Sequence, residues 1–261
     1  MANLTTMEMV SQLSKDDTSS HEIVAKLLQC NGLKFDVQNF SNNITNYLIL
    51  SDTKDYQPLF TAHIDKVSGS SGANDNSSSV AVLIYLARIF KEKGISASFA
   101  FLDGEEQGSR GASLFVDSHR NLNFSVIFAV DITGFGDTVA LACRRKRIKQ
   151  LKGARAREFL SSHHVAQMHW LPPGDDAILS KTGIPTYQVN VLPAEDVQAI
   201  NAFANEYGFL VEKAPSYALL IQNLEVMSTM HMGWRDSLKY ISKDSLDLAE
   251  TFLFDISEML N

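Results

Sequence analysis

The fold is decided by residues 77–102, which read SSSVAVLIYLARIFKEKGISASFAFL. In the first part of this stretch, apolar side chains recur at helical spacing between serines and a glycine, which predicts a helix over residues 77–93. The apolar run at residues 98–102 predicts a short buried strand, and a similar run at residues 59–62 precedes the helix. Short apolar strands that alternate with helices are typical of an α/β protein with a largely parallel, buried sheet.

The alternation continues on both sides of this stretch. Ser19 and Glu22 form a capping-box pair, which predicts the start of a helix that ends near Gly32. We interpret residues 194–227 as an insertion with helical segments, inside a single domain that spans residues 1–261. The remaining predicted elements are strands over residues 35–40, 45–50, 125–130 and 186–192, and helices over residues 111–119 and 246–260.

The composition is that of a globular protein. Of the 261 residues, 45% are hydrophobic, which excludes an intrinsically disordered chain. A net charge of −7 argues against binding to nucleic acid, which needs a basic face. No run approaches the roughly 18 apolar residues of a membrane span. Cys30 and Cys143 lack the spacing of a metal knuckle and no secretory signal is visible, so we expect a reduced, cytoplasmic protein.

Acidic and imidazole side chains gather just after the predicted strands. His63 and Asp65 follow the predicted strand at 59–62, Glu105 and Glu106 follow the strand at 98–102, and Asp131 follows the strand at 125–130. Ligands of open α/β sheets bind beyond the carboxyl ends of the strands, so these groups should converge on one site. Each group alone would also suit a surface ion pair or an acidic turn.

Two further residues have a functional and a structural interpretation. Asp75 lies in a tight Gly/Asn-rich loop before the helix, where a carboxylate can point inward or simply cap the helix. His231 lies in a Met-rich apolar context, where it is a candidate ligand or a hydrogen-bonded core histidine.

The order His-x-Asp, Asp, Glu-Glu, Asp, His resembles that of zinc-dependent exopeptidases with two co-catalytic metal ions. Among them it is most similar to the bacterial leucyl-type aminopeptidases. The resemblance extends from Thr61 to Asp236, which is most of the chain. The segments that carry it are Thr61–Asp65, Gly72–Ser77, Phe101–Gly108 with Gly111 and Ala112, Val130–Thr133, Gly174–Pro185 and Met230–His231.

The resemblance implies a set of metal ligands. It makes Asp75 the carboxylate that bridges both metal ions. His63 and Asp131 would complete the ligands of one ion, and Glu106 and His231 those of the other. Imidazole and carboxylate ligands without a thiolate suit zinc, with cobalt or manganese as alternatives.

The resemblance also implies the catalytic and substrate-binding residues. Glu105 would be the general base, and Asp65 would orient the imidazole of His63 from behind. Asp175 and Asp176 lie in the segment that would contact the substrate. The implied fold is a central mixed, largely parallel sheet with helices on both faces, a three-layer architecture.

The spacing between the motifs resembles the compact, single-domain members of the family. Only 12 positions separate His63 from Asp75, and 43 separate Asp131 from Gly174. Neither gap holds the lid or the dimerisation domain that other relatives insert there.

Two departures from the family pattern lie near the implied substrate pocket. Met232 follows the last histidine where Thr or Ser is usual, and an acidic residue, Asp236, comes five positions after that histidine and not four. Both departures bear on substrate specificity more than on hydrolysis.

These observations predict dinuclear, metal-dependent hydrolysis of the N-terminal peptide bond of peptides or amino-acid amides. A second hypothesis is an amidohydrolase acting on N-acyl amino acids or a carboxypeptidase, for which Arg235 and the basic run Arg144–Arg147 are candidate carboxylate-binding groups. A non-catalytic binding module and a one-metal cyclising transferase are further alternatives. The sequence leaves open a homo-oligomer and whether residues 194–227 cover the pocket or contact another subunit.

Overall fold

The computed structural model describes residues 4–15, 20–41, 43–51, 56–119, 124–144, 148 and 151–260. The helices are α1 (Thr6–Leu13), α2 (Ser20–Cys30), α3 (Ser79–Lys93), α4 (Arg110–Ser118), α5 (Gly153–Ser162), α6 (Asp175–Leu179), α7 (Ala194–Tyr207), α8 (Tyr217–Asn223) and α9 (Lys243–Leu260). The strands are β1 (Asp36–Asn39), β2 (Thr45–Ile49), β3 (Gln57–His63), β4 (Ser98–Leu102), β5 (Phe124–Val130), β6 (Thr138–Cys143), β7 (Val165–Met168) and β8 (Thr186–Leu192). Short helical turns are η1 (Ala73–Ser78), η3 (Ser180–Thr182), η4 (Gly208–Lys213), η5 (Glu225–Thr229) and η6 (Leu238–Tyr240).

The strands form one mixed sheet in the order β1-β2-β4-β3-β5-β8-β6-β7. The four central strands, β4, β3, β5 and β8, run parallel to one another. Antiparallel pairs join β1 to β2, β2 to β4 and β6 to β8. The register pairs His63 with Leu102 and Val130 with Val189, so the central strands end at the same edge. The predicted α/β fold with a mixed, largely parallel sheet is confirmed.

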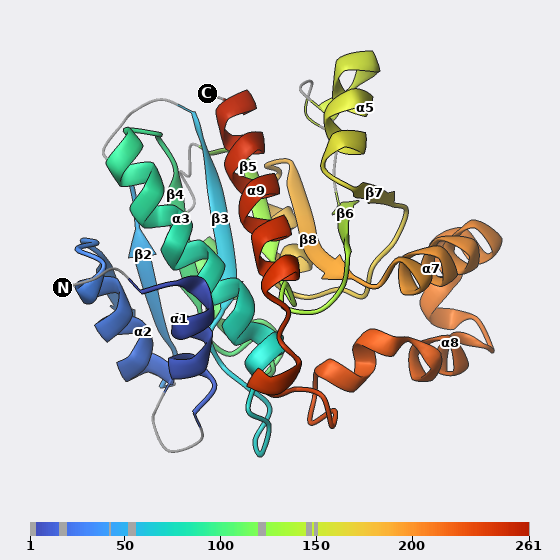
Figure 1. The fold of residues 1–261 in the computed structure, drawn as a ribbon, viewed down its shortest axis with the longest axis horizontal. Helices are drawn as coiled ribbons and strands as arrows, with labels where there is room; N and C mark the ends of the chain where they lie inside the picture. The colour runs from blue at the N-terminus through green and yellow to red at the C-terminus, as the bar shows by residue number, and fades with distance from the viewer. Residues whose placement is uncertain are drawn as a thin grey trace.

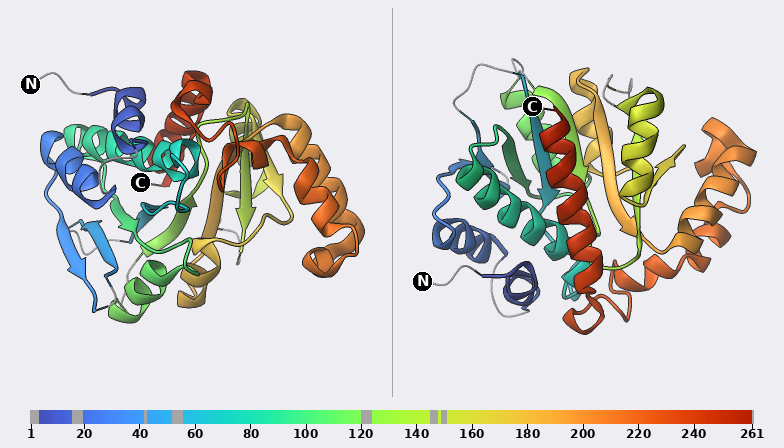
Figure 2. Two further views of the ribbon diagram at one scale, coloured as in Figure 1. Left: turned by 90° about the horizontal axis from the view of Figure 1, so that it is seen from below. Right: turned by 45° about the horizontal axis from the view of Figure 1, so that its top comes forward.

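Helices cover both faces of the sheet and so make three layers. Side chains of α1, α2, α3 and α9 pack on one face in the largest apolar cluster. Side chains of α4 and α6 pack on the opposite face. Figure 1 shows α3 and α9 crossing the near face, and Figure 2 (left) shows the sheet between the two helical layers.

Aromatic side chains of neighbouring strands form the centre of the larger cluster. The Phe60 ring stacks between those of Phe99 and Phe128, with centroids 5.5 Å and 5.3 Å away. Phe90 of α3 meets Phe60 edge-on. Each buried ring of this kind contributes about 1.5–3 kcal/mol of transfer free energy. This packing holds α3, the helix that connects β3 to β4, against the strands whose ends carry the site.

The elements α1, α5, α6, β6 and β7 were not predicted from the sequence. The strand β6 has the sequence TVALAC, in which only Thr138 and Val139 are β-branched and no residue is aromatic. Its strand conformation therefore depends on its pairing with β8 and β7. The complete capping box lies at Thr5 and Glu8, at the start of α1. Ser19, predicted to form such a box with Glu22, lies outside the described residues.

Residues 194–227 are helical, as predicted, and form α7, η4, α8 and η5. These elements lie beyond the end of the sheet that carries β6 and β7 (Figure 1). Val197 and Ile200 of α7 pack with Ala140 and Ala142 of β6 in a third apolar cluster. In the part of the chain that the structure describes, no helix has the length and hydropathy that crossing a membrane requires.

Candidate active site

Three parallel strands deliver the predicted groups to one edge of the sheet. His63 is the last residue of β3, Asp131 directly follows β5, and Glu105 and Glu106 follow β4 after a short turn. Because these strands are neighbours with aligned ends, their exit loops are adjacent. A backbone hydrogen bond of 2.8 Å from Ile64 to the carbonyl of residue 102 keeps two of the exits together.

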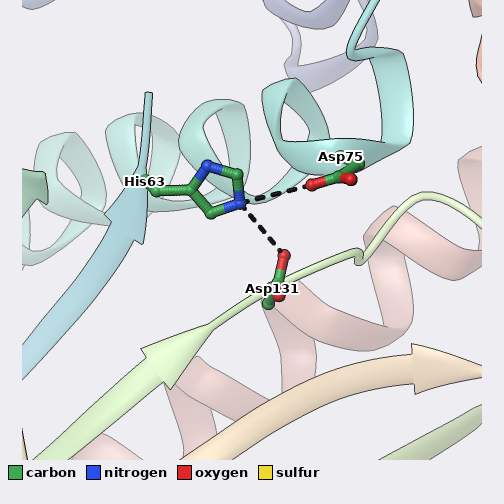
Figure 3. A group of neighbouring side chains, drawn as sticks. All are labelled: His63, Asp75 and Asp131. Atoms are coloured by element: carbon green, nitrogen blue, oxygen red, sulfur yellow. Dashed lines mark ion pairs between the residues drawn. The ribbon is translucent and has the colours of Figure 1, made fainter. Parts of the chain in front are cut away.

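The first cluster contains His63, Asp75 and Asp131. The Nε2 atom of His63 lies 3.3 Å from Asp75 Oδ1 and 3.5 Å from Asp131 Oδ1. Figure 3 shows both carboxylates pointing at this nitrogen from separate segments, Asp75 from the turn before α3 and Asp131 from the end of β5. The three donor atoms are close enough together to hold one metal ion.

The second cluster contains Asp75, Glu106 and His231. The Nε2 atom of His231 lies 3.5 Å from Asp75 Oδ2 and 3.7 Å from Glu106 Oε2. These three residues also bring their donor atoms within reach of one ion. Asp75 therefore directs one carboxylate oxygen to each cluster, which is the arrangement a bridging ligand requires.

The donor set fits divalent cations. Imidazole nitrogens and carboxylate oxygens suit zinc, and also cobalt or manganese. Glu106 Oε1 and Asp131 Oδ1 are buried with no hydrogen-bond partner among the described residues, so each has a lone pair for a cation. Burial alone would lower the pKa of His63, but three neighbouring aspartates hold it well above its ordinary value.

Asp65 connects the first cluster to the two glutamates. Its carboxylate accepts hydrogen bonds from the backbone N–H groups of Glu105, at 3.0 Å, and Glu106, at 3.1 Å. His63 Nδ1 lies 3.4 Å from Asp65 Oδ1 and 3.2 Å from the Asp65 carbonyl oxygen. The oxygen atoms of Asp65 thus face Nδ1, and Nε2 faces the cluster in which a metal ion would bind.

A buried carboxylate behind the site shapes the loop that carries Asp75. Asp236 accepts hydrogen bonds from the backbone N–H groups of Gly72, at 3.1 Å, and Asn74, at 2.9 Å, and from the Ser70 hydroxyl. Gly72 has a φ of +59°, and a Cβ atom there would lie 2.6 Å from the Lys66 side chain. The loop therefore depends on a glycine and on an acceptor supplied from residue 236.

The amide of Asn76 joins this loop to the exit of β5. It donates to the carbonyl of Val130 at 3.2 Å and accepts from the N–H of Ile132 at 3.1 Å. Asp131 lies between these two partners. The peptide bond between Asp75 and Asn76 is cis.

Glu105 is buried beside further carboxylates. Burial, together with the nearby carboxylates of Asp131 and Asp175, raises its pKa to about 8. Burial likewise raises the pKa of Glu106 and of Asp175 to about 7. A Cβ atom on Gly174 would lie 3.2 Å from Glu105 Oε1, so the 174–176 segment closes over this side chain.

The two aspartates predicted to bind substrate have different surroundings. Asp175 lines a small recess with Glu105 and His63. Asp176 lines the same recess, but it forms an ion pair with Arg144 and accepts a hydrogen bond from the N–H of Gly174. Its carboxylate is therefore engaged within the protein.

The arginines proposed as carboxylate-binding groups are engaged with other side chains of the protein where the structure describes them. Arg144 is held by Asp176, and Arg235 pairs with Glu225 and stacks on Trp234. Residues 145–147 of the basic run lie outside the described residues.

A cavity of about 300 Å³ opens from the two clusters. Its far wall is apolar, and residues 194–227 supply much of it, which the sequence left undecided. The lining residues from that segment are Ile200, Tyr217, Ile221, Leu224, Val226 and Met227. Two lining residues that the sequence analysis missed, Gln188 and Asn190, come from β8. Their only signal was a polar residue at alternate positions of an otherwise apolar strand.

Comparisons with known proteins agree with this architecture. The model of peptidase family M28 matches residues 46–229. A glutaminyl cyclase from Porphyromonas gingivalis is 16% identical, with a TM-score of 0.65 and 98% of each chain covered. A zinc-dependent exopeptidase from Parabacteroides distasonis is 14% identical, with a TM-score of 0.62 over 98% of this chain and 99% of that one.

A zinc aminopeptidase from Bacillus subtilis is 19% identical, with a TM-score of 0.56, and the match covers 83% of this chain but 49% of that one. At these identities the solved structures show the shared fold. The family match spans most of the chain and includes four of the five clustered residues, all except His231. The chain therefore belongs to peptidase family M28.

Proposed function

We propose that this protein is an aminopeptidase that hydrolyses the N-terminal peptide bond of peptides or amino-acid amides with two divalent metal ions, most suitably zinc. The observation that carries the proposal is the placement of Asp75, whose two oxygens face separate ligand clusters. His63 and Asp131 would hold one ion, and Glu106 and His231 the other. When bound, the ions would supply Lewis-acid activation of the scissile carbonyl and of the attacking water.

The chain's own residues provide the proton transfer. Glu105 lines the cavity beside both clusters, where its carboxylate can accept the proton of the attacking water and return it to the leaving amine. Asp65 fixes the backbone of Glu105 and the imidazole of His63 with one carboxylate. The free α-amino group of the substrate would lie near the second cluster, and the cavity would receive the side chain of the first residue.

The lining of the cavity favours an aminopeptidase over a deacylase or carboxypeptidase. A free substrate carboxylate needs a cationic partner, and no Lys or Arg lines the cavity among the residues described. We further infer that residues 1–261 act as one catalytic domain, with 194–227 as the insertion that walls the cavity. We also propose a cytoplasmic location, because the sequence has only two cysteines and they lack the spacing of a disulfide framework or a metal knuckle.

Changing Glu105→Gln tests the proposal. The amide cannot accept the water proton, so turnover of a free-N-terminal peptide should fall by a factor of roughly 10²–10⁴. The metal content, measured by mass spectrometry of the elements, should stay at two ions per chain. A variant that retained full turnover would show that Glu105 is not the base.

A glutaminyl cyclase is the second candidate function, because a protein of that name covers this chain almost end to end. The two activities differ in their products. An aminopeptidase removes the first residue of a peptide, whereas a cyclase converts an N-terminal glutamine with loss of ammonia and leaves the chain length unchanged. Mass spectrometry of one glutaminyl peptide separates them.

A further inference from the structure

Two polar side chains interrupt the apolar strand that forms the floor of the cavity. Every residue of β8 is buried. Val189 and Val191 belong to the main core on one face of the sheet. Gln188 and Asn190 line the cavity on the other face and are 5% and 4% exposed. Apolar residues at these two positions would bury more favourably, so the carboxamides need an explanation beyond packing.

The carboxamide of Gln188 is oriented by a fixed arginine. Gln188 Oε1 accepts a hydrogen bond of 3.3 Å from Arg144, which also donates to the Leu171 carbonyl oxygen at 2.8 Å. The ion pair with Asp176 holds the same guanidinium. Because the oxygen of Gln188 is engaged, its N–H₂ group is the end without a partner among the described residues.

The carboxamide of Asn190 has no hydrogen-bond partner among the described residues, and its Oδ1 is fully buried. Its position is fixed by the backbone on both sides. The carbonyl of Val189 accepts from the N–H of Asp131 at 2.9 Å, and the N–H of Val191 donates to the carbonyl of Ile132 at 3.2 Å. Asn190 therefore lies beside the first cluster, at the place where the side chain of a bound first residue would begin.

The rest of the lining restricts what these amides can bind. The carboxylates and imidazoles that line the cavity are the metal-site residues and Glu105, and its far wall is apolar. A charged substrate side chain would find no counter-charge away from the site, and a purely aliphatic one would leave both amides unpaired. A neutral side chain with an apolar stem and a hydrogen-bonding end satisfies the whole lining.

We propose that Gln188 and Asn190 select substrates whose first residue ends in an uncharged carboxamide. The substrate oxygen accepts from the Gln188 N–H₂ group, and the substrate N–H₂ donates to Asn190 Oδ1. This inference rests on the proposed function, since it places the first side chain in the cavity. A site built to pair a polar group rejects an isostere that lacks the group far more strongly than an apolar pocket rejects an extra methylene.

The test uses the metal-loaded full chain and peptides that differ only in the first residue, which is glutamine, methionine or glutamate. Methionine matches glutamine in length without the amide, and glutamate matches it with a charge. Products are identified by mass spectrometry, so that hydrolysis and cyclisation are both counted. We expect kcat/KM for glutamine to exceed the other two by about tenfold or more.

The variants are Asn190→Leu, which keeps the branched shape of the side chain, and Gln188→Met, which keeps its length. The control is Ile221→Val, which changes the same cavity without altering a polar group. Each polar variant should lower the glutamine-to-methionine ratio by about tenfold, and the control should leave that ratio unchanged. Asn190→Leu should unfold at the same or a higher temperature than the parent, because it removes an unpaired buried amide.

Calorimetric binding of the same peptides to metal-loaded Glu105→Gln protein separates the two ways of failing. One result would keep the selection by Gln188 and Asn190 but refute the proposed reaction: no peptide is processed, the glutamine peptide binds more tightly, and Asn190→Leu abolishes that preference. The selection itself would be refuted if the methionine peptide were bound or processed as well as the glutamine peptide. It would also be refuted if the polar variants left the glutamine-to-methionine ratio unchanged.

Discussion

The loop that carries Asp75 gives the sharpest prediction about how the site is built, because one buried side chain holds it. Asp236 is 5% exposed and accepts from two backbone N–H groups, those of Gly72 and Asn74, and from the Ser70 hydroxyl. In Asp236→Ala the Gly72 N–H keeps the Ser70 hydroxyl oxygen, 3.1 Å away, as an acceptor, but the Asn74 N–H loses the acceptor that Asp236 supplies. Since Asp75 belongs to both ligand clusters, displacement of this loop should weaken both.

The size of the effect follows from the one orphaned donor. A buried donor left without a partner costs about 1–3 kcal/mol, and the variant should lose roughly that much unfolding free energy. For a chain of this length, a loss of about 2 kcal/mol lowers the unfolding temperature by roughly 4–8 °C. Because both clusters are affected, the metal content should fall toward zero and not toward one ion per chain.

Thermal unfolding and elemental analysis of the purified variant measure both quantities. The matched control is Asp247→Ala, which removes a half-exposed carboxylate from a surface ion pair with Lys243. Such a pair contributes about 0.3–0.5 kcal/mol, so the control should keep its unfolding temperature and its metal. If Asp236→Ala had the same unfolding temperature as the parent and bound two ions, the buried carboxylate would not be what holds the loop.

Three further predictions concern the core, the second carboxylate and the acidity of the site. Phe60→Ala should lower the unfolding free energy by about 3–5 kcal/mol in denaturant titrations, while kcat per folded molecule stays at the parent value; a loss below about 1 kcal/mol would contradict the aromatic packing. Asp65→Asn should reduce metal affinity or kcat by roughly 10–100-fold, because the new N–H₂ group would face the backbone N–H of Glu105 or Glu106. If the variant and the parent had the same metal affinity and the same kcat, this hydrogen bonding would be dispensable. In metal-stripped protein, burial raises the pKa of Glu105 to about 8, so the folded state binds the proton more tightly than the unfolded state, and stability should fall as the pH rises from about 4.5 to about 8. Chemical denaturation at several pH values should show this slope in the stripped protein and not in the metal-loaded one; the same slope in both forms would refute the assignment.

The strands and the positions of the site groups were predictable because two independent signals coincide. Apolar runs of strand length marked β3, β4 and β5, and the chemically active residues follow each run directly. The sequence does not show how these residues come together in space, which depends on the fold. Nothing in the spacing shows that Asp75 faces both clusters, which depends on a left-handed Gly72 and on Asp236, a residue far along the chain.

Where the sequence analysis was incomplete, the missing information is tertiary. The pattern of Thr5 and Glu8 is the same kind of capping signal as that of Ser19, but it comes before a helix too short to recognise from periodicity. Asp176 could not be distinguished from Asp175, because its partner Arg144 lies 32 positions earlier in the chain, just after β6. Gln188 and Asn190 became interpretable only once the face of β8 that lines the cavity was known.

The most direct test of the central claim is digestion of one peptide mixture by the metal-loaded protein, followed by mass spectrometry. The mixture contains free, N-acetylated and C-terminally amidated forms of the same peptides. The two-cluster site with Glu105 as base predicts stepwise loss of residues from free N-termini, with or without a C-terminal amide, and no attack on the acetylated forms. Cleavage of acetylated peptides, or only of those with a free carboxyl end, would contradict the proposed aminopeptidase.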